Sequence, residues 1–305
     1  MTTRALGPGA GFDWIKRAIN LGAGNPRAIF GGAALFFVAI MGVVIVMSMV
    51  IGLFTATLQP GSTAALALSL LVTLPLLLVA ACLIVGYLRT IDAVESGRPA
   101  TATDVLKGFS DMQTSLRAFG LLLALAVLQN ALVAGIVATF SPELGTWYAQ
   151  IVQAQASGQP PTQLPQLPAG SGTVSILISL VMLLVYAVQS IGLGQVALGG
   201  RRFGGALADG FSGAIRNLLP LLVLAVVVIV AAIASGLVLL LVAAVIGLLA
   251  KLLGGWIAIL LAIPLYVAIV LALVVVSFGV MYHLWRDVAG GGAAVPPLPE
   301  GSVEL

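Results

Sequence analysis

The amino-acid sequence predicts an all-α membrane protein, a bundle of six transmembrane helices. The 305 residues are 61% hydrophobic and 8% charged, with a mean hydropathy of +1.19, which leaves too little polar surface for a water-soluble globule. Six stretches contain no Asp, Glu, Lys or Arg, and each is longer than the ~20 apolar residues that a helix needs to cross a bilayer. These expected spans are 29–54, 64–88, 118–140, 174–198, 218–250 and 256–285.

Short amphipathic segments precede the first, third and fifth spans, at Phe12–Leu21, Asp104–Leu116 and Ala206–Asn217. In the first of them the polar positions 13, 16, 17 and 20 follow the spacing of one helix face. We therefore expect three interfacial helices in the headgroup layer, with Trp14, Lys16 and Arg17 facing lipid. A simpler explanation stays open, because any loop with basic residues can look amphipathic.

The connections between spans are mostly short, which predicts a single domain over residues 1–289, followed by a flexible Gly- and Pro-rich tail over 290–305. Tight turns are expected at 55–63 and 251–255. The connection 141–173 differs, because it is long, uncharged apart from Glu143, and rich in Pro and Gln. This composition favours extended polyproline II structure, so we expect no packed core there.

The fifth span is unusually long, with 33 residues free of charge. A straight helix of that length measures about 50 Å at 1.5 Å per residue, so it must tilt, bend or project from the lipid. The alternative, three shorter spans over 217–285, requires a turn near Ser235 without polar loop residues. Backbone polar groups must be satisfied within lipid, which favours two spans.

The positions of the basic residues predict the orientation of the chain. Of the 13 Lys and Arg residues, only Lys251 falls on the second side of a six-span arrangement. Basic residues near span ends stay in the cytoplasm, so both termini are expected there. The first hydrophobic stretch is longer than the 7–15 residues of a cleavable signal, and we interpret it as a retained span.

Several short motifs carry a family resemblance. Trp14 lies in the first amphipathic segment, Asn25-Pro26 leads into the first span, and Arg216-Asn217-x-x-Pro220 leads into the fifth. The chain resembles uncharacterised six-span inner-membrane proteins of Gram-negative bacteria, which are distantly similar to the membrane region of some glycerophosphodiester phosphodiesterases. The likeness covers most of the chain and implies a bacterial inner membrane. It implies no activity, because no phosphodiesterase-type catalytic domain is recognisable in the sequence.

Three uncharged polar residues within the spans form a candidate intramembrane cluster, namely Gln129, Asn130 and Gln189. They are interpreted first as a structural tie between spans three and four, and alternatively as the lining of a polar path. One His, one Cys and no intramembrane carboxylate cannot supply the usual ligands of a zinc site, so no metal and no cofactor are expected. No basic run is long enough for nucleic-acid binding.

The leading functional hypothesis is a non-enzymatic membrane protein that binds lipid, another membrane protein or a small hydrophobic molecule. The second is a transporter or channel for an uncharged or amphipathic solute. A distant third is an intramembrane serine hydrolase, because Ser212 in Gly-Phe-Ser-Gly and His283 on the last span are similar to the catalytic pair of rhomboid proteases. That family's second-span histidine and Trp-Arg loop have no counterpart here, so we assign no catalytic residue.

Overall fold

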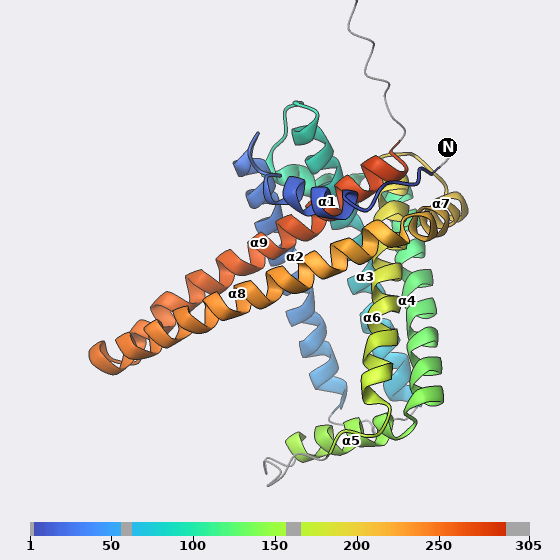
Figure 1. Ribbon diagram of the computed structural model, residues 1–305. Coiled ribbons are helices and arrows are strands. Elements are labelled where there is room, and N and C mark those ends of the chain that lie inside the picture. Colours follow the sequence, from blue (N-terminus) through green and yellow to red (C-terminus); the bar gives the residue numbers. More distant parts are fainter. Residues whose placement is uncertain (1–2, 56–62, 157–165, 291–305) are drawn as a thin grey trace, which may run out of the picture. The chain divides into compact units, whose positions relative to one another are not determined.

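The computed structural model describes residues 3–55, 63–156 and 166–290, in which all regular secondary structure is helical and no strand occurs (Figure 1). The elements are α1 (Ala10–Ile19), α2 (Pro26–Thr55), α3 (Thr63–Glu95), the 3-10 helix η1 (Ala102–Ser110), α4 (Met112–Phe140), α5 (Glu143–Ala156), α6 (Ser171–Ala197), α7 (Phe203–Arg216), α8 (Leu218–Leu253) and α9 (Trp256–Val288). Six of them, α2, α3, α4, α6, α8 and α9, are long and apolar enough to cross a membrane. The all-α polytopic fold is therefore confirmed, with a helix long and apolar enough to cross a membrane in the region of each of the six expected spans.

The chain forms two compact units, one made of Met1–Leu122 with Ala187–Leu305, the other of Leu123–Tyr186. The first unit holds α1, α2, α3, η1, α7, α8, α9 and the adjoining ends of α4 and α6. The second holds α5 and the rest of α4 and α6. The expectation of one domain over 1–289 stays a prediction, and the expected tail beyond residue 290 lies outside the described residues.

The core of the first unit gathers at one end of its long helices. Large side chains with less than 2% exposure include Trp14, Tyr87, Ile91 and Tyr282. Beyond that end, α8 and α9 carry apolar side chains that are mostly exposed within the chain, as expected for helices surrounded by lipid. The packed end is therefore the region where specific contacts can build a site.

Helix α2 begins with a well-formed cap. The Asn25 side chain accepts a hydrogen bond from the Ala28 amide at 3.1 Å, and its own amide donates to the Ala100 carbonyl at 3.0 Å. Pro26 occupies the first helical position, where its missing N–H costs nothing. The Asn-Pro motif thus starts the span and also joins it to the chain that enters η1.

The second amphipathic segment is shorter than expected. We predicted one helix over Asp104–Leu116, but η1 ends at Ser110, and Met112 and Leu116 belong to the first turns of α4. Asp111 causes the break, because its carboxylate accepts a hydrogen bond from the Thr114 amide at 3.2 Å, the geometry of a helix N-cap. The other two segments correspond closely to α1 and α7.

The expected extended connection 141–173 contains a helix, α5, over Glu143–Ala156. The prediction was wrong because the prolines cluster at its two ends, at position 142 and from position 160 onward. Pro142 immediately precedes the helix, and Glu143 in its first turn complements the positive end of the helix dipole. Most of the Pro- and Gln-rich sequence, together with most of the predicted turn at 55–63, lies outside the described residues.

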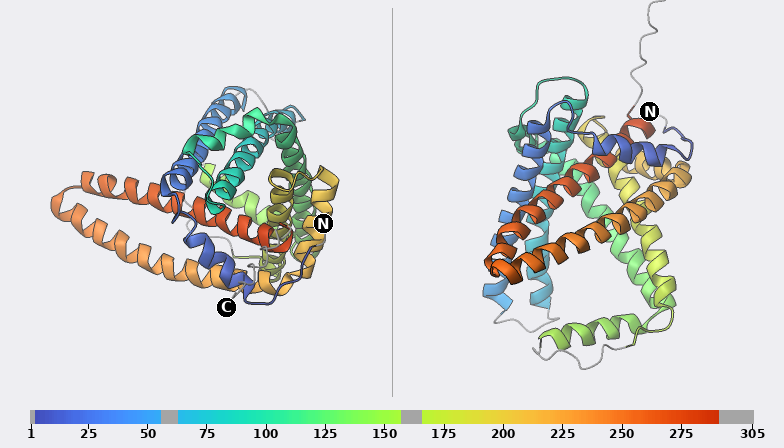
Figure 2. Two further views of the ribbon diagram at one scale, coloured as in Figure 1. Left: turned by 90° about the horizontal axis from the view of Figure 1, so that it is seen from above. Right: turned by 60° about the vertical axis from the view of Figure 1, so that its left-hand side comes forward.

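Helices α8 and α9 form an antiparallel hairpin and lie side by side in every view (Figures 1 and 2). Helix α8 is continuous over 36 residues, so the alternative with a turn near Ser235 is wrong. The expected tight turn at 251–255 is confirmed. There Gly254 adopts φ +105°, a conformation that side chains rarely tolerate.

Candidate functional site

Helix α1 packs closely against the buried ends of α8 and α9. The backbone of Gly11 lies directly against Pro220 and Leu224 of α8, and a Cβ built on Gly279 of α9 would lie 2.8 Å from that of Ala18. These small residues let the helices approach closely. Trp14 and Ala18 are consequently fully buried.

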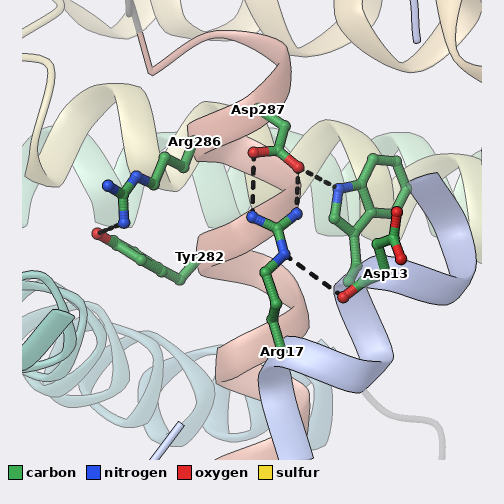
Figure 3. Close-up of polar contacts among 6 residues, drawn as sticks. Asp13, Arg17, Tyr282, Arg286 and Asp287 are labelled. Atoms are coloured by element: carbon green, nitrogen blue, oxygen red, sulfur yellow. Dashed lines mark hydrogen bonds and ion pairs between the residues drawn. The ribbon is translucent and has the colours of Figure 1, made fainter. Parts of the chain in front are cut away.

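Asp287, in the last turn of α9, anchors the polar side of this interface (Figure 3). Its carboxylate accepts a hydrogen bond from the Trp14 indole at 3.0 Å and forms an ion pair with both arms of the Arg17 guanidinium. Such bidentate pairs fix the relative orientation of the two side chains and also add electrostatic attraction. The position of α1 against α9 is therefore specified by both packing and directional bonds.

The structure places Trp14 differently from the lipid-facing residue that we expected. Its ring is wholly covered by the protein, and its indole N–H donates a hydrogen bond to the half-buried Asp287 carboxylate. Phe12 and Ile19 are instead the exposed apolar residues of α1, at 54% and 66%. For Lys16, which is exposed, and Arg17, which is half-buried, contact with lipid headgroups stays a prediction.

The chain before α1 is tied to the junction of α7 and α8 by Asn217, which is 1% exposed. Its amide donates to the carbonyls of Arg4 and Gly213, both at 2.8 Å, and its oxygen accepts the Leu6 amide at 2.9 Å. The Arg4 amide in turn donates to the Val288 carbonyl at 2.9 Å. The N-terminal segment thus bridges two helix ends that are distant in sequence.

A second polar chain joins α3 to α9. The Tyr282 hydroxyl donates to the Asp92 carboxylate at 2.9 Å, and Arg286 lies 3.4 Å from the same hydroxyl (Figure 3). Asp92 is also paired with Arg98. These contacts hold the C-terminal ends of two membrane-spanning helices together.

The loop before α4 is fixed by another ion pair. Arg89 contacts the Asp111 carboxylate at 2.7 Å and donates to the Ala197 carbonyl at 3.1 Å. The hydrogen bond from Arg89, with the Thr114 contacts, lowers the pKa of Asp111 to about 2. Asp111 is therefore ionised at any physiological pH, and this contact holds the end of α3 beside the start of α4 and the end of α6.

An open cavity of about 500 Å³ lies between α1 and the end of α3. It is lined by three polar residues of α1, by the residue that follows that helix and by one residue of α3, namely Asp13, Lys16, Arg17, Asn20 and Glu95. The sequence identified the first four of these residues by their spacing. It did not indicate Glu95, which the fold brings to them from the last position of α3.

The charges at this cavity are not all neutralised within the protein. No ion pair within 4 Å involves Asp13, Lys16 or Glu95 among the described residues, whereas Arg17 is held by Asp287. The described residues also contain no group of three His, Cys, Asp or Glu side chains placed to hold a metal ion. The cavity therefore presents one cation, Lys16, and two carboxylates, Asp13 and Glu95, that form no ion pair among the described residues.

A further cavity of about 440 Å³ lies between α8 and α9, and its walls are apolar, with Leu241, Val245 and Leu265 among them. Such a wall accepts hydrocarbon but offers no polar group that would orient a ligand.

The candidate intramembrane cluster belongs to both units. Asn130 and the half-buried Gln129 lie in the second unit, and the amide of Asn130 donates to the Ala126 carbonyl of its own helix at 2.8 Å. Gln189, also half-buried, lies in the first unit. A tie or a path formed by these residues stays a prediction.

The pair considered for a serine hydrolase is not hydrogen-bonded in the part of the chain that the structure describes. The Ser212 hydroxyl lies 3.0 Å from that of Thr3. His283 is 2% exposed, and neither of its ring nitrogens has a hydrogen-bond partner among the described residues. A nucleophile needs its base within hydrogen-bond reach, so this geometry gives Ser212 no activation.

The chain matches no model of a known protein family, no curated protein and no solved structure.

Proposed function

We propose that this multi-pass membrane protein binds phospholipid, without catalysing a reaction, through the headgroup phosphate at the cavity between α1 and α3. The observation that carries the proposal is the cavity itself, in which Lys16 projects from α1 without an ion-pair partner among the described residues. A lysine ammonium is a compact charge that binds phosphate well.

Arg17 supports Lys16 indirectly. Its guanidinium is occupied by Asp287, and its Nε faces the Asp13 carbonyl at 3.4 Å. Arg17 therefore holds α1 in place, which leaves Lys16 as the group that contacts the phosphate.

The surroundings of the cavity suit a lipid. Glu95 ends the α3 span, so the cavity lies where that helix leaves the hydrocarbon. On α1, Phe12 and Ile19 are four residues before and three after Lys16, on the same side of the helix. Both are exposed, and they provide apolar contacts for acyl chains beside the charged cavity.

Lys16→Gln is the test of phospholipid binding. A basic residue near an anionic lipid surface contributes about 1 kcal/mol, which corresponds to about a fivefold change in affinity. We expect the purified variant to bind added phospholipid about fivefold more weakly, measured by native mass spectrometry after delipidation.

Lys107→Gln is the matched control, since Lys107 is an exposed lysine of η1 that does not line the cavity. It should bind phospholipid as the wild type does. Equal phospholipid affinity for wild type and Lys16→Gln would contradict the proposal.

We also propose that the protein resides in a bacterial inner membrane with both termini in the cytoplasm. The support is the placement of all Lys and Arg residues except Lys251 on one side of the six spans. A reporter that is active only in the cytoplasm should work at the C-terminus and at Gly97, and a periplasmic reporter should work at Gly158. Cytoplasmic activity at Gly158 would refute this topology.

A further inference from the structure

Most acidic side chains of the described region form ion pairs, but the cavity between α1 and α3 is lined by acidic side chains that do not. Eight Asp and Glu residues are described, and five form ion pairs, namely Asp92, Asp104, Asp111, Asp209 and Asp287. Of the other three, Asp13 and Glu95 both line this cavity. Two carboxylates without ion pairs beside a phosphate-binding lysine suggest that a cation belongs there.

We infer that the cavity selects an ethanolamine-type phospholipid, with Asp13 and Glu95 binding its primary ammonium while Lys16 binds its phosphate. The inference rests on the proposed phospholipid binding and adds the identity of the headgroup.

The balance of charge fits a headgroup of zero net charge. Among the residues that line the cavity are two cations, Lys16 and Arg17, and two carboxylates, Asp13 and Glu95. A zwitterion can place each of its charges beside an opposite one here, whereas an anionic headgroup would bring only negative charge to the two carboxylates.

The place of Glu95 strengthens its preference for a cation. It is the last residue of α3, where the aligned peptide dipoles already carry partial negative charge. An ammonium near this carboxylate therefore interacts favourably with both the side chain and the helix end.

The lining also distinguishes a primary ammonium from a choline headgroup. Sites for quaternary ammonium groups are typically built from aromatic rings, and none of the five lining residues is aromatic. A primary ammonium has three N–H donors that carboxylates can accept, and a quaternary one has none. The cavity volume of about 500 Å³ lies within the usual range for small ligands.

The experiment compares delipidated protein with phospholipids that share acyl chains and differ in headgroup, by native mass spectrometry and thermal shift. We expect wild type to bind the ethanolamine lipid at least tenfold more tightly than the choline or glycerol lipid. Glu95→Gln and Asp13→Asn should each reduce this preference severalfold without changing the melting temperature in the absence of lipid. Glu143→Gln, which alters the one other unpaired acid of the described region, should leave the preference intact.

The outcomes separate this inference from the proposed function. If Lys16→Gln weakens binding of all phospholipids but wild type shows no headgroup preference, the headgroup assignment is wrong and phospholipid binding stands. If Lys16→Gln changes nothing, both are wrong. Soluble phosphoethanolamine, added as a competitor, should displace the lipid only weakly. If soluble phosphoethanolamine bound with the same affinity as the phospholipid, the ligand would not be a membrane lipid.

Discussion

Gly86→Ala is expected to destabilise the first unit by about 1–3 kcal/mol, the cost of overpacking a close contact, and Gly86→Val by more. A Cβ on Gly86 of α3 would overlap the Val105 carbonyl group of η1. The clash involves backbone atoms, so no change of side-chain rotamer can relieve it. We expect a lower melting temperature in detergent and a lower yield of folded protein.

The contact is reciprocal, which provides a second variant. A Cβ on Gly108 of η1 would overlap the Cys82 carbonyl of α3, so Gly108→Ala should have a similar effect. Gly42→Ala is the control, because a Cβ on that glycine of α2 would meet no atom within 4 Å and alanine favours a helix. A wild-type melting temperature for both Gly86→Ala and Gly108→Ala would show that α3 and η1 do not pack as described.

Asn217→Leu is expected to cost about 3 kcal/mol, because each buried group left without its hydrogen bond costs roughly 1–3 kcal/mol. The substitution removes the partners of the Arg4 and Gly213 carbonyls and of the Leu6 amide at a site that is 1% exposed. The N-terminal segment should detach first. Limited proteolysis would detect this as faster cleavage before α1, and thermal unfolding would measure the loss of stability.

Two further asparagine variants make the Asn217 prediction specific. Asn217→Asp keeps the acceptor for Leu6 but turns a carboxylate toward two carbonyl oxygens, so it should also be destabilised. Asn20→Ala removes an exposed side-chain amide at the end of α1, which donates one hydrogen bond within the described residues, to the Lys16 carbonyl, and should change stability by less than about 0.5 kcal/mol. Equal melting temperatures for the Asn217→Leu and Asn20→Ala variants would contradict the prediction.

Local sequence was sufficient wherever one physical constraint dominated. Lipid requires about 20 apolar residues per helix, so hydropathy alone located the six spans, including the continuous α8. Caps act within one turn, which explains why Asn25-Pro26 marked the start of α2 correctly. Composition averaged over a long loop concealed α5, because the helix formers of 143–156 were counted together with the prolines that follow them.

The candidate site was predictable only in part. Amphipathic spacing placed Asp13, Lys16, Arg17 and Asn20 on one face of α1, because that pattern depends only on helix geometry. The same pattern could not show what covers the other face, so Trp14 was expected to contact lipid although it is buried against α9.

Short-range patterns are enough to define a six-span helical membrane protein with a polar helix before its first span. That Asp287 anchors this helix, and that Glu95 completes the cavity beside it, follows from the packing of distant segments. Asp287 is 270 positions from Arg17, and nothing in local spacing distinguishes it from the other acidic residues at span ends. Such pairings arise from how whole helices pack, where small residues such as Gly11 and Gly279 allow α1 to approach α8 and α9 closely.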